Sequence, residues 1–187
     1  MSQVTTPIQN LLVIDSQVSN WQSLASGVKP DTAVLILDSG SDGLTQISNY
    51  LATLSNAGTQ NFVPLQSLQI ISHGSAGKLL LGSSTITTSN LSLYSKQLAS
   101  IGSNLTDTGD ILLYGCDVAA NKPGLDFINQ IAALTSADVA ASNDVTGSAT
   151  LGGNWQLEVA TGTIESALAL NTATLNSYSS TLKYSNQ

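Results

Sequence analysis

The sequence predicts an α/β fold: a mostly parallel central sheet of about six strands, flanked by helices on both faces. Two observations support this prediction. Short, continuous apolar runs recur along the 187 residues, and such runs are typical of strands buried on both faces of a sheet. Between them lie segments whose apolar residues recur at helical spacing, as expected for helices that cover a parallel sheet.

The first half of the chain predicts three strands and two helices. Residues 10–15 (NLLVID) form an apolar run and predict the first strand, and residues 16–28 follow with helical spacing. The β-branched and aliphatic residues of 32–38 predict the second strand. Residues 42–58 place their apolar side chains on one helical face, and residues 67–73 predict the third strand.

The next part of the chain continues this alternation. Two apolar stretches around a Gly-Ser pair predict a small hairpin over residues 78–87. Helical spacing predicts helices over residues 90–102 and over residues 123–135, where a proline suits the first turn. The apolar runs at residues 109–115 and 137–142 predict the fourth and fifth strands.

The C-terminal part is less regular. Residues 154–166 alternate between apolar and polar side chains, which predicts an antiparallel edge strand or a hairpin, and residues 167–182 predict a last helix. No internal repeat, linker or second core divides the sequence. We therefore predict one domain over residues 1–187, with a core over about 10–166 and a C-terminal helix or tail over about 167–187.

Charge argues against nucleic-acid and membrane partners. The formal net charge is −7, and the five basic residues are all lysines. Because phosphate neutralisation needs clustered Lys or Arg, no nucleic-acid partner is expected. The same scarcity removes the basic face of a membrane-binding helix, and no apolar run approaches the ~20 residues that span a bilayer.

Cysteine and histidine each occur once, which narrows the chemistry of the chain. One cysteine cannot form an internal disulfide, and one Cys with one His does not supply the ligands of a structural zinc site. Residues 38–49 resemble a calcium loop only superficially, because Asn49 stands where a bidentate Glu is required. No dinucleotide-binding glycine motif follows the first strand. We therefore expect neither a metal nor a cofactor.

The single histidine and the single cysteine occupy parallel positions. His73 ends the third predicted strand, and Cys116 follows the fourth. Because the carboxyl ends of parallel strands lie at one edge, where ligands bind, we expect the two side chains to meet there. A thiol attacks as the thiolate, and a nearby imidazole can take its proton. The two positions predict a Cys–His catalytic dyad.

Neighbouring glycines extend this prediction. Gly74 allows a sharp turn, and its N–H, together with that of Cys116, is placed to stabilise a developing oxyanion. Each residue also has a structural interpretation, since a lone cysteine is commonly a small buried hydrophobe and a lone histidine a hydrogen-bonded structural residue. The occurrence of both residues at one edge favours the catalytic interpretation.

An apolar strand ending in His-Gly, followed by one ending in Gly-Cys, resembles the caspase, gingipain and legumain superfamily of cysteine peptidases. A longer resemblance is to an uncharacterised caspase-like domain of large bacterial secreted and adhesin-like proteins. It rests on the stretches LLVIDSQVSNWQSL, ILDSGSDGLTQI, IISHGSAGKLLLGSSTI, DILLYGCDVAA and ADVAASNDVTG…GGNWQLE. It covers about residues 10–166 and implies a caspase-like three-layer sandwich.

The resemblance implies roles for the same residues. His73 would handle the proton, Cys116 would be the nucleophile, and the N–H groups of Gly74 and Cys116 would bind the oxyanion. The implied reaction is cleavage of a peptide bond through an acyl-enzyme. The implied substrate is a peptide or protein, and autoprocessing of a larger parent polypeptide belongs to the same expectation.

The resemblance to caspases fails at the residue before the scissile bond, P1. Caspases bind an acidic P1 side chain with arginines, and this chain has no arginine. A pocket containing Asp15, Asp117 or Asp144 would instead favour a basic P1 residue by charge pairing. These aspartates also have structural interpretations, as a helix cap, a solvated loop residue and a turn residue respectively.

Two points stay open at this stage. The composition, rich in Ser, Thr and Asn and without arginine, suits an extracellular bacterial protein, whereas the segment MSQVTTPIQN has neither a basic nor an apolar signal-peptide region. We therefore expect an extracellular or cell-surface location as part of a larger protein exported without such a peptide. A cytoplasmic location stays open. The alternative function is a non-catalytic binding or scaffold module of a surface protein, and acyl transfer to an amine is a third hypothesis.

Overall fold

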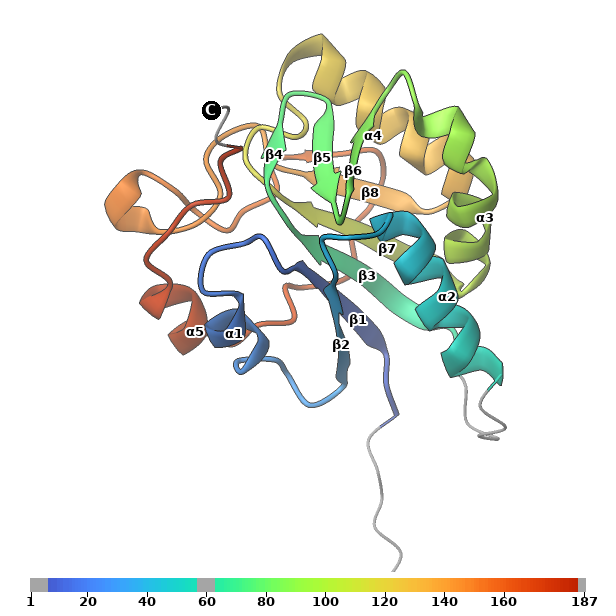
Figure 1. Cartoon of the computed structure of the whole chain (residues 1–187), viewed down its shortest axis with the longest axis horizontal. Coiled ribbons are helices and arrows are strands. Elements are labelled where there is room, and N and C mark those ends of the chain that lie inside the picture. Colours follow the sequence, from blue (N-terminus) through green and yellow to red (C-terminus); the bar gives the residue numbers. More distant parts are fainter. Residues whose placement is uncertain (1–6, 57–62, 185–187) are drawn as a thin grey trace, which may run out of the picture.

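A six-stranded sheet forms the centre of the computed structural model, which describes residues 7–56 and 63–184 (Figure 1). Its strand order is β2-β1-β3-β7-β8-β9. The strands are β1 (Asn10–Asp15), β2 (Thr32–Leu37), β3 (Leu65–Ile71), β7 (Leu105–Tyr114), β8 (Asp138–Ala141) and β9 (Val159–Ala160). Only β9 runs antiparallel, against β8. The predicted α/β class with a mostly parallel sheet is confirmed.

A smaller antiparallel sheet stands at the carboxyl end of β3. It joins β4 (Gly74–Ser75), β5 (Lys78–Leu81) and β6 (Ser84–Thr87) in that order. The β5–β6 pair is the predicted hairpin, and its turn has Gly82 at a φ of 63°, which suits glycine. The two residues of β4 extend this hairpin directly after His73.

Helices cover both faces of the central sheet, as predicted. One face carries α2 (Gly43–Asn56), α3 (Ser95–Ser103) and α4 (Asn121–Thr135), with the 3-10 turn η1 (Leu91–Tyr94) before α3 (Figure 1). The other face carries two short helices, α1 (Trp21–Ala25) and α5 (Thr172–Ser177). A second 3-10 turn, η2, spans Ala149–Leu151. In residues 7–56 and 63–184, no helix combines the length and apolarity needed to cross a bilayer.

Side chains alternate between the two faces along each strand, which produces two buried clusters. In β1, Leu11 and Val13 point to the face covered by α2, α3 and α4, whereas Leu12 and Ile14 point to the other face. All four are fully buried. The strand is apolar at successive positions because both faces of the sheet are covered by helices.

Of the predicted elements before the C-terminal part, the first helix was too long and the fourth strand was too short. The first helix comprises only Trp21–Ala25, because residues 16–20 form turns and Asn20 adopts a left-handed conformation. The fourth strand begins at Leu105 and not at residue 109. The expected end of the second helix, residues 57–58, lies outside the described residues.

The largest correction concerns the C-terminal part. Within residues 154–166 only Val159–Ala160 pairs as a strand. The last helix covers only Thr172–Ser177 of the predicted 167–182. The side chain of Asn171 accepts a hydrogen bond from the Thr174 N–H and fixes the start of this helix, and Tyr178 ends it in an extended conformation. The chain beyond Tyr178 is therefore free to cross the carboxyl edge of the sheet.

Candidate active site

Two adjacent strands deliver the predicted dyad to one edge of the sheet. β3 and β7 pair in parallel, with Ile71 opposite Tyr114. The Ser72 N–H continues this pairing by donating to the Tyr114 carbonyl at 3.1 Å. His73 lies two residues beyond β3, and Cys116 lies two residues beyond β7. The structure thus confirms that the two segments leave the sheet side by side.

Gly74 brings these two segments into direct contact. A Cβ atom at position 74 would lie 2.5 Å from Val118 Cγ2 and 3.0 Å from the Cys116 carbonyl oxygen. Only glycine fits this approach without displacing the turn that follows Cys116. The backbone of Gly74 therefore lies directly against the turn that carries Cys116.

Cys116 is buried, and its sulfur has polar partners. The side chain is fully buried, the Thr146 N–H donates to Sγ at 3.3 Å, and the thiol faces the Thr146 carbonyl at 3.6 Å. Burial raises the pKa of the thiol, and the charge of Asp117 acts in the same direction. Hydrogen bonds from the N–H groups of Thr146 and Leu182 and the charge of Lys183 oppose this rise without cancelling it.

His73 is half-buried beside the small sheet. Its Nε2 lies 3.1 Å from the Gln17 carbonyl oxygen, which can only accept, so Nε2 carries a proton. Its Nδ1 is buried and has no hydrogen-bond partner in the described part of the chain. Within those residues no hydrogen bond joins His73 to Cys116. The structure brings the two segments together but does not form the dyad hydrogen bond.

The C-terminal segment, residues 180–184, lies extended across this edge. The Gly74 N–H donates to the Leu182 carbonyl at 3.1 Å, and the Tyr184 N–H donates to the Gly74 carbonyl at 3.3 Å. The Leu182 N–H in turn donates to the Thr146 carbonyl at 2.9 Å. Isolated bridges pair Lys183 with Gly74 and Thr181 with Gly147. The segment is thus held in an extended, strand-like conformation by backbone hydrogen bonds to two loops of the site.

This strand is the feature that sequence reasoning missed, since a helix was predicted to run through residue 182. A signal was present: Ser179, Ser180 and Thr181 have side chains that compete for backbone hydrogen bonds and favour turns or strands over helix interiors. Nothing in the sequence indicated that Gly74 and Thr146 would be the partners of this strand.

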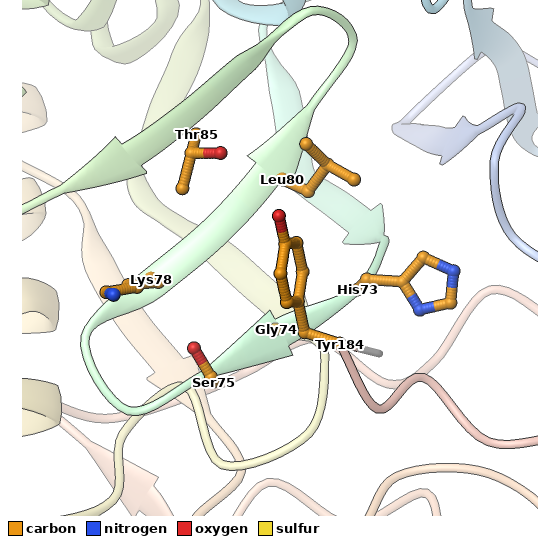
Figure 2. Close-up of a pocket in the computed structure, with 7 residues that line it drawn as sticks. All are labelled: His73, Gly74, Ser75, Lys78, Leu80, Thr85 and Tyr184. Atoms are coloured by element: carbon orange, nitrogen blue, oxygen red, sulfur yellow. The ribbon is translucent and has the colours of Figure 1, made fainter. Parts of the chain in front are cut away.

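Two cavities border His73, and Figure 2 shows the residues that line the larger one. The larger, of about 250 Å³, is lined by His73, Gly74, Ser75, Lys78, Leu80, Thr85 and Tyr184. The other, of about 240 Å³, is lined by Gln17, His73, Leu80 and Tyr184. Figure 2 shows the Tyr184 ring standing between Leu80 and the β4 backbone, while the imidazole of His73 points away from Lys78. Among the described residues, no acidic side chain lines either cavity.

The structure places the three predicted P1 aspartates in different surroundings. Asp15 is fully buried, and its oxygens accept hydrogen bonds from the Gln17 N–H at 2.9 Å and the Gly82 N–H at 2.7 Å. Asp15 therefore holds the β5–β6 turn and is not open to a substrate. Asp144 is exposed and accepts from Ser142 and Asn154.

Asp117 is the aspartate nearest the thiol. It has a φ of 61°, and its N–H donates to the Asp144 carbonyl at 2.9 Å. Asp117 and Asp144 thus lie together beside the Cys116 turn, but neither lines the cavities next to His73. The structure does not gather the three aspartates into one pocket.

Comparison with known proteins gives one family match and no function. A search of curated protein sequences finds no significant match. The model of the family described as "Domain of unknown function (DUF4347)" matches residues 11–182, which include both His73 and Cys116 as well as Leu182. Because this match spans nearly the whole chain, the protein belongs to the DUF4347 family.

Proposed function

We propose that this protein is a cysteine peptidase that cleaves its own chain, with Cys116 as nucleophile and His73 as the proton-transferring group. The observation that carries the proposal is the hydrogen bond from the Gly74 N–H to the Leu182 carbonyl, beside the Cys116 thiol. An extended peptide whose carbonyl meets an oxyanion donor next to a thiol is the arrangement of a bound peptidase substrate. The resemblance to caspase-like peptidases supports the same function.

The bound segment identifies the bond to be cut as Leu182–Lys183. Leu182 occupies P1, because its carbonyl accepts from Gly74. Lys183 and Tyr184 then lie on the leaving side, and Tyr184 lines both cavities that border His73. His73 is thus on the side where the departing amine must receive a proton.

The proposed reaction needs only these groups and one water molecule. The Cys116 sulfur attacks the Leu182 carbonyl carbon as its proton passes to His73, and the Gly74 N–H stabilises the oxyanion. The C–N bond then breaks, and His73 returns the proton to the new amine of Lys183. Water hydrolyses the thioester, which leaves a carboxylate on Leu182 and the free thiol of Cys116. Attack requires His73 to approach the thiol, since they share no hydrogen bond at rest.

This assignment replaces the expected basic P1 residue with an apolar one. The Leu182 side chain is fully buried in an apolar cluster that also contains Cys116 and Tyr178. Asp15 is buried and already hydrogen-bonded, and no acidic group of residues 7–56 or 63–184 lines the cavities beside His73. A charged P1 side chain would lose its hydration in the place of Leu182 without gaining a partner.

The experiment uses acyloxymethyl ketone probes with Leu or Lys at P1, followed by peptide mapping of Cys116. We expect the leucine probe to modify Cys116 at least about tenfold faster than the lysine probe, a difference of about 1.4 kcal/mol. The variant Gly74→Val, which displaces the proposed oxyanion donor, should slow labelling. Failure of both probes on the folded protein, with normal alkylation of Cys116 after denaturation, would refute the peptidase proposal.

A second candidate function is a non-catalytic module that keeps this fold. The fully buried thiol, its raised pKa and the lack of a hydrogen bond to His73 favour this alternative. In that case the C-terminal segment is a structural strand, and Cys116 is a small core residue. The probe experiment separates the two functions, because a structural cysteine shows no preference for the P1 side chain.

A further inference from the structure

Three carboxylates converge at a place that the proposed peptidase chemistry does not use. Asp110 lies within β7 and pairs in register with Asp138, the first residue of β8. Glu165 approaches them from the segment that follows β9. One carboxylate oxygen from each residue lies within 4.8 Å of the others. The cluster joins two strands and a C-terminal segment that are far apart in sequence.

Asp110 is the buried member of this cluster, and it is only half satisfied. Its side chain is fully buried. Its Oδ2 accepts hydrogen bonds from the N–H groups of Glu165 at 2.9 Å and Ser166 at 2.8 Å. Its Oδ1 is buried and has no hydrogen-bond partner within residues 7–56 and 63–184. Burying a carboxylate oxygen without a hydrogen-bond partner costs free energy, so the Oδ1 atom indicates that a ligand binds here.

No basic side chain in the described chain neutralises the cluster. The ion pair in the described part of the chain joins two exposed side chains of α4, Lys122 and Asp126, and does not involve these carboxylates. Three neighbouring carboxylates thus place negative charge next to the buried side chain of Asp110. Like charges at this separation destabilise each other unless a cation or another positive group stands between them.

We propose that Asp110, Asp138 and Glu165 bind one calcium ion. Calcium takes carboxylate oxygens at 2.3–2.6 Å in a flexible geometry, so two ligands on opposite sides of the ion stand about 4.6–5.2 Å apart. The three oxygens all lie within 4.8 Å of one another, so one calcium coordination sphere can include all of them. Asp138 is half-buried and Glu165 is exposed, which leaves an entry path and room for water ligands.

Other common metals fit this site less well. Magnesium requires oxygens at 2.0–2.1 Å in nearly ideal octahedral geometry, and it gives up its waters reluctantly. Zinc in proteins is usually held by nitrogen or sulfur ligands, and the cluster offers only oxygen. The bound ion would cross-link β7, β8 and the start of the segment that leads to α5 and residues 180–184. Its effect would therefore be measurable as stability.

The test is calcium binding to the whole chain after treatment with a chelator, followed by calorimetric titration and thermal unfolding. We expect one calcium per chain and a melting temperature that rises with calcium concentration, because an ion that binds only the folded state stabilises it. Magnesium at the same concentrations should give a smaller rise. The assay is independent of peptidase activity, so it can be run in Cys116→Ala.

Matched variants decide whether these residues are the ligands. Asp138→Asn and Glu165→Gln should each weaken calcium binding at least about tenfold, in the range typical for loss of a charged ligand. Asp107→Asn removes an exposed carboxylate of the same strand and should leave binding unchanged. Since Asp110→Asn affects a buried residue, the two more exposed positions keep the test valid if that variant fails to fold.

Three results would overturn the proposal. The first is the absence of calcium binding to the folded wild-type chain. The second is unchanged binding in both Asp138→Asn and Glu165→Gln, which would place the ion elsewhere. The third is magnesium binding as tight as that of calcium, which would exclude the assignment of the metal.

Discussion

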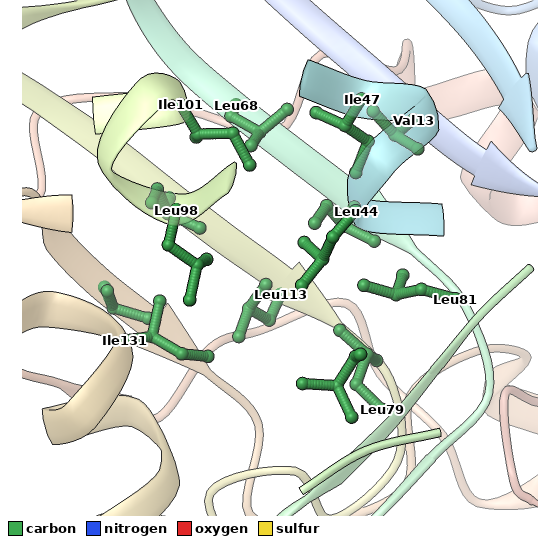
Figure 3. Close-up of a cluster of buried hydrophobic side chains, with 14 of the residues drawn as sticks. Val13, Leu44, Ile47, Leu68, Leu79, Leu81, Leu98, Ile101, Leu113 and Ile131 are labelled. Atoms are coloured by element: carbon green, nitrogen blue, oxygen red, sulfur yellow. The ribbon is translucent and has the colours of Figure 1, made fainter. Parts of the chain in front are cut away.

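The two faces of the central sheet are covered in contrasting ways. On one face, α2, α3 and α4 pack regular apolar stripes against the strands, and Figure 3 shows these side chains interdigitating. On the other face, two short helices and long irregular segments cover the sheet. The irregular cover is held by buried polar groups such as Gln69, whose amide binds the Ala167 carbonyl at 2.9 Å and the Ala169 N–H at 2.9 Å.

The two faces therefore contribute differently to stability and to function. The helix-covered face is stabilised by the burial of apolar side chains, which is non-directional and tolerates substitutions that keep the volume of the core. The irregular face uses specific hydrogen bonds, and it contains the Cys116 thiol, residues 180–184 and the Asp110 cluster. Directional contacts place individual atoms, so the features that can carry function gather on this face.

The largest effect is expected on the helix-covered face. Phe127 of α4 is fully buried, and Phe127→Ala should lower the free energy of unfolding by about 3–5 kcal/mol, because it removes apolar burial and leaves a cavity. The control is Leu125→Ala on the same helix, where the side chain is 43% exposed and a change within about 0.5 kcal/mol is expected. Denaturant unfolding measures both. Equal losses in the two variants would contradict the assignment of the core.

An intermediate effect is expected from the polar bridge on the irregular face. Gln69→Leu keeps the side-chain size but leaves the Ala167 carbonyl and the Ala169 N–H unpaired, which should cost about 2–3 kcal/mol. Hydrogen exchange should accelerate at Ala169 more than at α4. The control is Gln66→Leu, at a half-buried position on the same strand, where the side chain loses only a hydrogen bond near the surface, to the Thr108 carbonyl. If hydrogen exchange accelerated equally across the molecule, the irregular face would unfold together with the rest of the protein, contrary to this account.

The smallest effect concerns the thiol. Burial raises the pKa of the Cys116 thiol above its value in the unfolded chain. The stability that the neutral, buried thiol contributes is therefore complete below the unfolded pKa, and it is lost as the pH rises toward the folded pKa. Burial of Tyr114 and Tyr178 raises their pKa values too and adds losses of the same sign. Wild type should therefore lose more stability than Cys116→Ala between about pH 8 and 10. Parallel pH profiles of the two proteins would contradict this account.

Prediction from sequence succeeded where the fold depends on periodic burial. The strands at 10–15 and 32–38, the hairpin at 78–87 and the adjacency of the His73 and Cys116 segments all follow from apolar patterns and from the rules of parallel sheets. The apolar patterns are local in sequence, and the adjacency of the two segments follows from the order of the strands alone. They carry no information on long-range polar partners.

Prediction failed where single long-range hydrogen bonds decide the structure. Leu182 lies extended because Gly74 and Thr146 bind its backbone, and no pattern in the sequence around Leu182 names these partners. The Asp15 carboxylate accepts a hydrogen bond from the N–H of Gly82, 67 residues away, and sequence patterns cannot reveal such a partner. The Asp110 cluster likewise joins three separate segments. Such contacts become visible only when the fold is known.

The central claim is tested most directly by the intact mass of the purified chain. After incubation at neutral to mildly alkaline pH, we predict that wild type gains a species ending at Leu182, with Lys183–Gln187 released, whereas Cys116→Ala stays uncut. Leu182→Lys should also stay uncut, which distinguishes the apolar P1 assignment from general peptidase activity. A wild-type chain that stays intact while Cys116 reacts with the leucine probe would refute self-cleavage at this bond. An intact chain that also fails to react with the probe would contradict the peptidase account as a whole.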